Sequence, residues 1–274
     1  MYMFFMQSFR FIFLTSFLSF SNALPAGFVY VGDIIPDIQI SLRYASEENF
    51  SGHVVNGYLS NVSILTEAAA VALKQAQILA KDKGYEFVIY DGYRPQKSVN
   101  QFMNWSADPN IPPTKKNFYY PRIDKQDAFE LGYIAKKSGH TRGSTIDLTL
   151  IAHGKQIQNP LTPIQRNLTD NSTIYYLDDG TLDMGSSFDL FDLASHTNST
   201  LVNSIYQERR LILKHIMEQA GFTNYDREWW HYTLNNEPFP DTYFDFDIQL
   251  SSAAALSTNK SYFLLIFLFY ISKI

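Results

Sequence analysis

Both ends of the chain are strongly apolar, and they confine a water-soluble domain to the residues from about 24 to 250. Residues 1–20 are rich in Phe, and Ser21-Asn22-Ala23 follow with small residues at the two positions that a signal peptidase reads. We therefore expect a secretory signal peptide over residues 1–23, with an uncleaved membrane anchor as the alternative. The chain contains no cysteine, so its stability has to come from a packed core rather than from disulfides.

The second apolar segment is the C-terminal tail, residues 251–274. Its apolar stretch, 262–271, is shorter than the roughly 20 residues that a membrane-spanning helix needs. Small residues at 251–255 and a polar spacer at 257–261 precede it, which is the order found in a GPI-attachment signal. The tail therefore predicts membrane anchoring, and a tail that merely packs or inserts shallowly is the alternative.

Sequons for N-glycosylation are more frequent than the roughly two or three that we expect by chance. Asn-x-Ser/Thr triplets begin at Asn49, Asn61, Asn104, Asn167, Asn171, Asn198 and Asn259. The excess favours a glycosylated protein that is secreted or held at the cell surface. In a bacterium the same signals would predict a periplasmic protein.

Size and charge limit the class of protein further. Residues 24–250 suffice for one domain with a single core. The net charge is −5 and the pI is about 5.7, without a run of Lys or Arg, which argues against nucleic acid as a partner. Nothing in the sequence fixes the oligomeric state. Residues 154–183 are rich in Asn, Thr, Pro and Asp, and we expect them to form an inserted surface loop.

Hydrophobic periodicity predicts helices and strands in an irregular order. Helices are expected over 65–83, from 96 to about 105, and over 204–219, and buried strands over 86–90 and 146–150. There is no regular alternation of strands with helices along the chain. We therefore expect an α+β fold, a single domain with helices packed on a mainly antiparallel sheet.

Two histidines and a carboxylate are candidate metal ligands. His140 and Asp147 lie in the stretch 138–147, and His231 lies in the stretch Glu228-Trp229-Trp230-His231. Catalytic zinc takes three such ligands and keeps a fourth position for water. Gly143 would let the chain turn between His140 and Asp147, so that residues seven apart converge. The alternative is a surface histidine and a capping aspartate.

A carboxylate and a guanidinium could complete a hydrolytic site. Glu228 is three residues from His231, which suits a general base acting on water, and Trp229 and Trp230 suggest a walled site that is poor in water. Arg94 follows the strand at 86–90 and could stabilise a developing oxyanion. The alternatives are surface or local ion pairs for both residues, with Arg227 or a lysine for Glu228 and with Asp91 for Arg94.

Several longer motifs then carry a resemblance to a known family. They are Tyr44-Ala45 with Asn49-Phe50-Ser51-Gly52, Asp91-Gly92-Tyr93-Arg94-Pro95-Gln96-Lys97, residues 138–150, Met184-Gly185-Ser186-Ser187-Phe188-Asp189, residues 228–232 and Tyr243-Phe244-Asp245-Phe246. In this order, from about Ile34 to Phe246, they resemble the zinc D-alanyl-D-alanine dipeptidases of the VanX type, within the wider group of D-Ala-D-Ala metallopeptidases.

The resemblance implies a role for each residue. It implies one zinc ion per chain bound by the two histidines and Asp147, with Glu228 as base, Arg94 at the transition state and a small dipeptide as substrate. It also implies that Asp189 receives the free ammonium of the substrate, with Ser138 and Tyr44 near the dipeptide. A carboxylate in that place would penalise peptides extended at the amino end.

Two features depart from the resemblance. The inserted segment 154–183 looks longer than the family usually has and enters just before Asp189, so it could cap or resize the pocket. Secretion is the second departure, because the resistance enzymes are cytoplasmic.

Three functions stay open at this point. They are a D-Ala-D-Ala dipeptidase, a D,D- or L,D-carboxypeptidase acting on longer cell-wall peptides, and a non-enzymatic zinc-stabilised binding protein. The presence of both Glu228 and Arg94 argues against the third, since a structural metal site needs neither a base nor an oxyanion partner.

Overall fold

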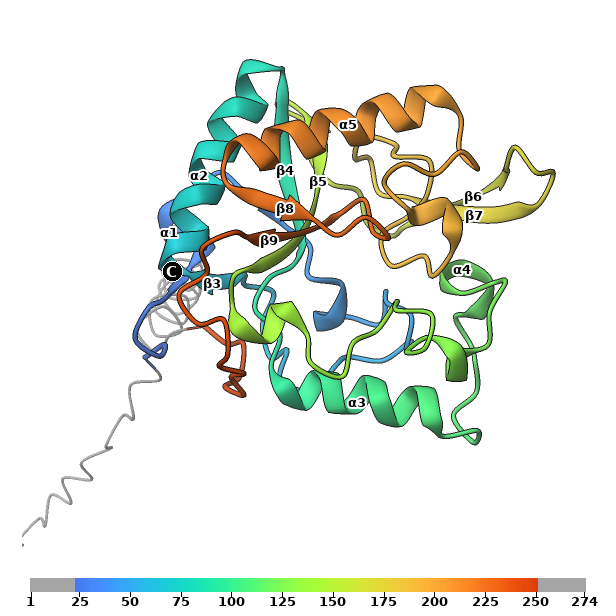
Figure 1. Cartoon of the computed structure of the whole chain (residues 1–274), viewed down its shortest axis with the longest axis horizontal. Helices are drawn as coiled ribbons and strands as arrows, with labels where there is room; N and C mark the ends of the chain where they lie inside the picture. The colour runs from blue at the N-terminus through green and yellow to red at the C-terminus, as the bar shows by residue number, and fades with distance from the viewer. Residues whose placement is uncertain (1–22, 251–274) are drawn as a thin grey trace, which may run out of the picture. The chain divides into compact units, whose positions relative to one another are not determined.

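The fold was derived from a computed structural model, which describes residues 23–250 (Figure 1). The helices are α1 (Val31–Ile34), α2 (Glu67–Asp82), α3 (Gln96–Ala107), α4 (Lys116–Tyr119) and α5 (Ser204–Gln219). The strands are β1 (Phe28–Tyr30), β2 (Gln39–Ile40), β3 (Ile64–Thr66), β4 (Tyr85–Asp91), β5 (Thr145–Ala152), β6 (Thr162–Asn167), β7 (Thr173–Asp178), β8 (Phe222–Asn224) and β9 (His231–Leu234).

A five-stranded sheet in the order β2-β4-β5-β9-β8 forms the centre of the domain. Only the β2–β4 pair is parallel, and the other three pairs are antiparallel. The strands β4 and β5 are buried along nearly their whole length, while α2 and α5 pack on each other and on β4 and β8. The predicted α+β architecture with a mainly antiparallel sheet is therefore confirmed.

The helices begin and end close to where periodicity places them. The apolar face of α2 contributes Leu73 and Ala76 to the core, and Thr66 caps the helix by accepting a 3.3 Å hydrogen bond from the amide of Ala69. Pro95 directly precedes α3, where a residue without an amide hydrogen costs nothing. The helix α5 spans 204–219 and ends just before Gly221, as predicted.

The inserted segment differs from its prediction. The expected surface loop at 154–183 contains an antiparallel β-hairpin, β6 and β7, paired from Thr162↔Asp178 to Asn167↔Thr173. Strand β6 is almost wholly exposed, whereas β7 buries Ile174 and Tyr176 on one face. Polar and turn-forming residues dominate the segment, and they concealed the short alternation of buried and less buried residues in β7. Ile174 packs in a second small core with Leu168 from the hairpin turn and with Leu190, Ala194 and Val202 from the segment that follows the hairpin.

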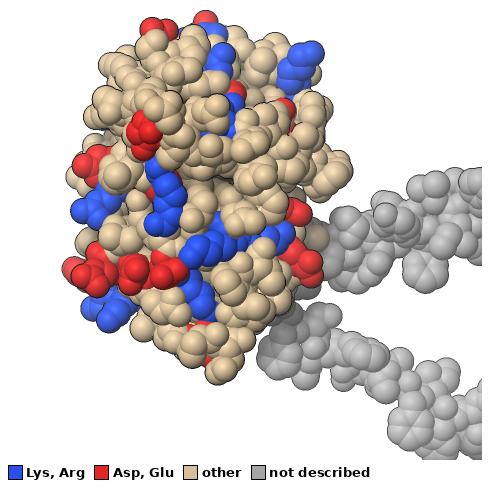
Figure 2. Space-filling model, turned by 90° about the vertical axis from the view of Figure 1, so that its right-hand side faces the viewer, with Lys and Arg blue, Asp and Glu red and all other residues tan. Residues whose placement is uncertain are grey.

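Charged side chains of both signs are mixed on one face of the domain (Figure 2). Figure 2, which looks at the hairpin side, shows acidic and basic side chains interspersed, so no broad field of one sign extends over this face. Among residues 23–250, no helix has the length and apolar character needed to cross a membrane. The predicted C-terminal tail, residues 251–274, lies outside the described residues. The predicted signal peptide, residues 1–23, also lies outside them except for Ala23.

Candidate active site

The register of three neighbouring strands brings the polar residues of the site together. Asp91 at the end of β4 is opposite Asp147 on β5, and Asp147 is opposite His231 at the start of β9. All three residues therefore lie in one row across the sheet. Side chains in such a row are neighbours, which explains how residues far apart in sequence converge.

His140 reaches the same row from the turn before β5. It lies in a short 3-10 turn, Gly139–Arg142, which Ser138 caps by accepting a 3.3 Å hydrogen bond from the amide of His140. Gly143 ends the turn with a φ of 85°, and a Cβ built there would lie 2.2 Å from the ring of Phe28. Only glycine fits this left-handed position, so Gly143 lets the chain reverse toward Asp147, as predicted.

The three predicted ligands form one cluster. His140 Nε2 lies 3.3 Å from Asp147 Oδ2, and His231 Nδ1 lies 3.0 Å from Asp147 Oδ1. One potential ligand atom from each residue falls within 4.8 Å of the other two. The buried Asp147 Oδ1 makes no well-formed hydrogen bond despite its close imidazole neighbour. Two imidazole nitrogens and one carboxylate, which has an unsatisfied buried oxygen, fit a zinc ion.

A backbone contact fixes which nitrogen of His140 faces the cluster. His140 Nδ1 lies 2.8 Å from the carbonyl oxygen of Gly92 and donates to it, which leaves Nε2 free to bind a metal ion. The carboxylate of Asp91 lies 3.5 Å from the same Nδ1. This outer contact orients the ring before any metal ion binds.

Charge within the cluster favours a cation. Burial alone would raise the pKa of Asp147, but the adjacent imidazoles of His140 and His231 hold it well below its usual range. Burial would lower the pKa of His231, yet its close polar contact with Asp147, together with the charges of Asp147 and Glu228, raises that pKa to about 10. The negative potential that attracts a proton here also attracts a divalent metal ion.

Arg94 faces the cluster, and its predicted ion pair with Asp91 also exists. Arg94 Nε donates to Asp91 Oδ2 at 2.9 Å, and Arg94 Nη2 lies 3.7 Å from Asp147 Oδ2. Asp91 is fully buried and accepts a second hydrogen bond, of 2.6 Å, from the Tyr58 hydroxyl. The guanidinium also lies over the ring of Tyr44, 5.0 Å from its centroid. The ion pair therefore fixes Arg94 at the site instead of competing with a role there.

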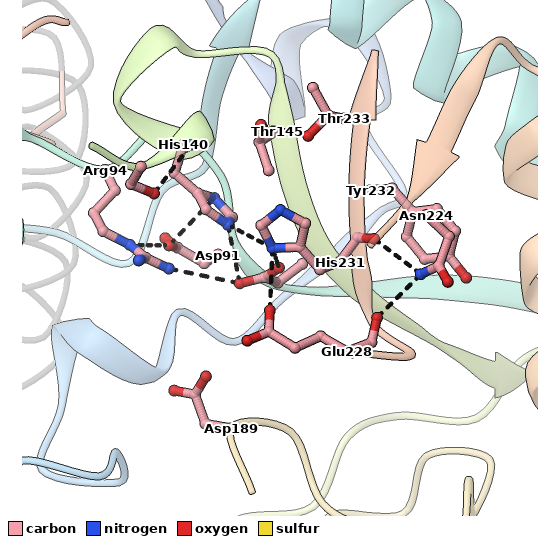
Figure 3. A network of polar contacts seen from close by, with 12 residues as sticks. Asp91, Arg94, His140, Thr145, Asp189, Asn224, Glu228, His231, Tyr232 and Thr233 are labelled. Carbon is pink, nitrogen blue, oxygen red and sulfur yellow. Dashed lines mark hydrogen bonds and ion pairs between the residues drawn. The ribbon is translucent and has the colours of Figure 1, made fainter. Parts of the chain in front are cut away.

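Glu228 points at the cluster as predicted. Its Oε2 lies 3.3 Å from His231 Nδ1 (Figure 3), and the residue is only 8% exposed. The side-chain amide of Asn224 donates 3.0 Å hydrogen bonds to the carbonyl oxygens of both Glu228 and His231, which fixes the turn between them. Arg227, the alternative partner of Glu228, donates instead to the carbonyl oxygen of Leu131.

The walls of the site are not the ones that we expect from sequence. A cavity of about 270 Å³ opens beside the cluster, and Trp229 and Trp230 are buried elsewhere and do not line it. The two tryptophan rings contact each other edge to face, with 5.2 Å between their centroids, and both pack into the core. The aromatic lining consists of Tyr44, Phe50, Phe102, Tyr133 and Tyr225. Tyr133 and Tyr225 stand in no motif, and no sequence pattern marked them.

Asp189 closes the cavity on the side opposite Arg94 and Glu228 (Figure 3). It is 5% exposed and adopts a φ of 59°, a left-handed conformation that is uncommon outside glycine. Tyr44 Oη donates to its Oδ2 at 2.7 Å. Burial, and then the nearby charge of Asp147, raises the pKa of Asp189 well above its usual value. A buried carboxyl of this kind is suited to receiving a cation.

The structure therefore brings together all eight of the residues predicted for the site. The ligand cluster, Glu228 and Arg94 line one side of the cavity, and Tyr44, Ser138 and Asp189 complete its lining. Asp91 was considered only as an ion-pair partner, yet it supports both Arg94 and His140.

Comparisons with known proteins match the chain to a peptidase family. The family model for peptidase family M15, described as D-Ala-D-Ala dipeptidase, matches residues 25–160 and 162–249. D-alanyl-D-alanine dipeptidases from Enterococcus faecalis and Streptomyces coelicolor are each 40% identical, over 223 and 222 residues respectively. Each of these matches covers 81% of this chain and 98% of the relative.

A solved structure is also similar, but more distantly. It is a mutant of the vancomycin-resistance D,D-pentapeptidase VanY in complex with Zn(II), with a TM-score of 0.34 and 16% identity over 65% of this chain and 77% of that chain. The family model and the relatives cover nearly all the described residues, and the chain therefore belongs to the D-Ala-D-Ala dipeptidase family of metallopeptidases.

Proposed function

We propose that this protein is a zinc-dependent dipeptidase that hydrolyses D-alanyl-D-alanine. The observation that carries the proposal is the convergence of a three-ligand cluster, Glu228, Arg94 and Asp189 on one cavity. The family and its curated relatives, which are named D-alanyl-D-alanine dipeptidases, support the choice of substrate.

His140, Asp147 and His231 would hold the zinc ion. Bound there, zinc would supply Lewis-acid activation of a water molecule and of the scissile carbonyl group. The protein sets which ring nitrogen of each histidine would bind the metal. His140 Nδ1 donates to the carbonyl oxygen of Gly92, which leaves Nε2 for the metal, and His231 presents its Nδ1 beside Asp147.

The proton steps fall to Glu228. It takes a proton from the attacking water as the water oxygen bonds to the carbonyl carbon, and it returns that proton to the amine nitrogen as the C–N bond breaks. Arg94 stabilises the negative charge that develops on the carbonyl oxygen. Asp91 and the ring of Tyr44 hold the guanidinium in place, so no reorganisation is needed as the charge appears.

Asp189 gives the site its preference for a dipeptide. It lies across the cavity from the hydrolytic residues and would pair with the free ammonium group of the substrate. A peptide extended at that end has no ammonium group there and would leave the buried carboxyl without its partner. Ser138, which also lines the cavity, would lie near the dipeptide.

A hydrolysis assay with two substrates tests the proposal against the alternatives. The zinc-loaded full-length protein is given D-Ala-D-Ala and, separately, a longer peptide that ends in D-Ala-D-Ala. We expect cleavage of the dipeptide only. Cleavage of only the longer peptide would establish a carboxypeptidase, and a protein that binds zinc but cleaves neither would be a binding protein.

We also propose that the protein is secreted or held at the cell surface and carries N-linked glycans. Exposed side chains support glycan attachment at Asn167, Asn171 and Asn198, whereas Asn49 is fully buried and its amide donates to backbone carbonyl oxygens. Mass spectrometry of the protein purified from its native host, before and after enzymatic deglycosylation, tests this. An unchanged mass would contradict it.

A further inference from the structure

Arg210 is a fully buried arginine whose guanidinium binds only neutral acceptors. It lies on α5, and its Nε donates to the carbonyl oxygen of Met184 at 2.7 Å. Its Nη1 donates to the carbonyl oxygen of His196 at 2.7 Å, and its Nη2 donates to the carbonyl oxygen of Ala194 at 2.9 Å and to Ser186 Oγ at 3.2 Å. A buried charge is costly and is retained in folds only with such complete hydrogen bonding.

All four acceptors belong to one segment, residues 184–196, and this segment carries Asp189. Met184 and Ser186 precede Asp189, whereas Ala194 and His196 follow it, so the guanidinium closes the segment into a loop. Asp189 stands within that loop in its left-handed conformation. Aspartate adopts a positive φ more often than most non-glycine residues, yet the conformation still costs free energy that its surroundings offset.

The same guanidinium reaches the hydrolytic side of the cavity through one serine. Ser186 Oγ accepts from Arg210 Nη2 and also from the indole Nε1 of Trp229, at 3.0 Å. The backbone amide of Trp229 in turn donates to the carbonyl oxygen of Ser195, at 3.1 Å. Trp229 directly follows Glu228. Arg210 therefore lies at the junction of the segment that presents Asp189 and the segment that presents Glu228.

We infer that Arg210 is a positioning residue for substrate selection, which sets the distance between the carboxyl of Asp189 and the bond-breaking residues. Its planar fork of donors suits this task, because it can hold four acceptors in fixed directions. A lysine retains the charge but offers a single ammonium group with three donors. Loosening the loop in this way would let Asp189 move, and it would weaken the preference for a free amino group without removing any group that touches the substrate.

The inference rests on the proposed function, and its test separates the two. The zinc-loaded full-length protein and its Arg210→Lys variant are given D-Ala-D-Ala and N-acetyl-D-Ala-D-Ala, and the ratio of the two kcat/KM values is measured. We expect that ratio to fall about tenfold in the variant, mainly through a higher KM for the free dipeptide. A loss of folded enzyme would lower both kcat values together and leave the ratio unchanged.

Lys125 provides a matched control. It is also a buried cation, and its ammonium group donates to the backbone carbonyl oxygens of Trp105, Asp108 and Ile111, none of which lies in residues 184–196. The Lys125→Met variant should keep the wild-type ratio even where it loses stability. If Arg210→Lys does not fold, Ser186→Ala removes the hydroxyl that joins Arg210 to Trp229 and to Ser195 Oγ. It keeps the three hydrogen bonds from Arg210 to backbone carbonyl oxygens and should lower the ratio in the same direction.

A wild-type protein that cleaves both substrates equally, or neither, overturns the proposed function and with it the selection by Asp189. A wild-type protein that prefers the free dipeptide, with the same ratio in Arg210→Lys or, where that variant does not fold, in Ser186→Ala, overturns the positioning role alone. A fall in the ratio for the Lys125 control as large as that for Arg210 would also overturn it.

Discussion

Tyr44 Oη donates a 2.7 Å hydrogen bond to Asp189 Oδ2. The ring of the same tyrosine lies under the guanidinium of Arg94, with 5.0 Å between the guanidinium carbon and the ring centroid. Tyr44 thus contacts both the carboxyl proposed to receive the substrate ammonium and the cation proposed to stabilise the oxyanion. The two ends of the substrate site are linked through one buried side chain, and this link leads to the first prediction.

Tyr44→Phe should weaken dipeptide selection while leaving the aromatic wall in place. A hydrogen bond to a charged group contributes about 1.5–3 kcal/mol, so we expect kcat/KM for D-Ala-D-Ala to fall about 10- to 100-fold. The contact between the ring and Arg94 persists in Phe, so kcat should fall less than KM rises. Steady-state kinetics measure this split, and an unchanged KM would contradict it.

Asp189→Asn should stabilise the folded protein at neutral pH. A carboxyl whose pKa is raised on folding lowers stability wherever the unfolded chain is ionised, which is above its ordinary pKa of 3.8. Asn cannot ionise, it tolerates a positive φ, and its oxygen can still accept from Tyr44. Thermal unfolding should show a higher Tm for the variant at pH 7 and a smaller difference as the pH approaches 3.8. A lower Tm at pH 7 would contradict this account.

Dipeptide affinity should rise with pH below the raised pKa of Asp189. In that range the free enzyme carries a neutral carboxyl, and pairing with the ammonium group requires loss of its proton. The affinity should therefore change by up to about tenfold per pH unit and level off above that pKa. Calorimetric titration of the Glu228→Gln variant with D-Ala-D-Ala measures both the affinity and the released proton. Binding that releases no proton would argue against a neutral Asp189.

Arg94→Lys should impair the chemical step. Loss of a fixed donor to a developing oxyanion typically lowers kcat about 10²- to 10³-fold, and a lysine cannot hold Asp91 and the substrate together as the guanidinium does. Arg142→Lys is a suitable control, because Arg142 pairs with Glu237 and does not line the cavity. Rapid-mixing kinetics at equal zinc content compare the two. Equal kcat values for both variants would remove Arg94 from the mechanism.

Local motifs suggest His140, Asp147, His231, Glu228 and Arg94 as candidates, whereas Tyr44, Ser138 and Asp189 are implied by the family resemblance alone. Gly143 predicts the reversal that brings His140 to Asp147, and the alternation of 146–150 predicts a strand whose side chains face opposite sides. The row formed by Asp91, Asp147 and His231, in contrast, depends on strand register. Register follows from long-range pairing, which a single sequence does not display.

The features that sequence reasoning missed are those set by tertiary packing. Trp229 and Trp230 adjoin Glu228 in sequence, yet both side chains enter the core, because their neighbours in space decide where they point. The buried role of Arg210 has no local signature, since its four acceptors come from residues 184–196. The hairpin at 162–178 was concealed by its polar composition, and only β7 buries apolar residues against the domain.

The most direct test of the central claim compares the wild-type protein with Glu228→Gln, each loaded with zinc to the same measured content, in hydrolysis of D-Ala-D-Ala. The change removes the proton carrier and keeps the size of the side chain beside His231. The account predicts rapid cleavage by the wild type and at least about a hundredfold lower kcat for the variant. Equal rates at equal zinc content would contradict the role of Glu228 and the mechanism built on it.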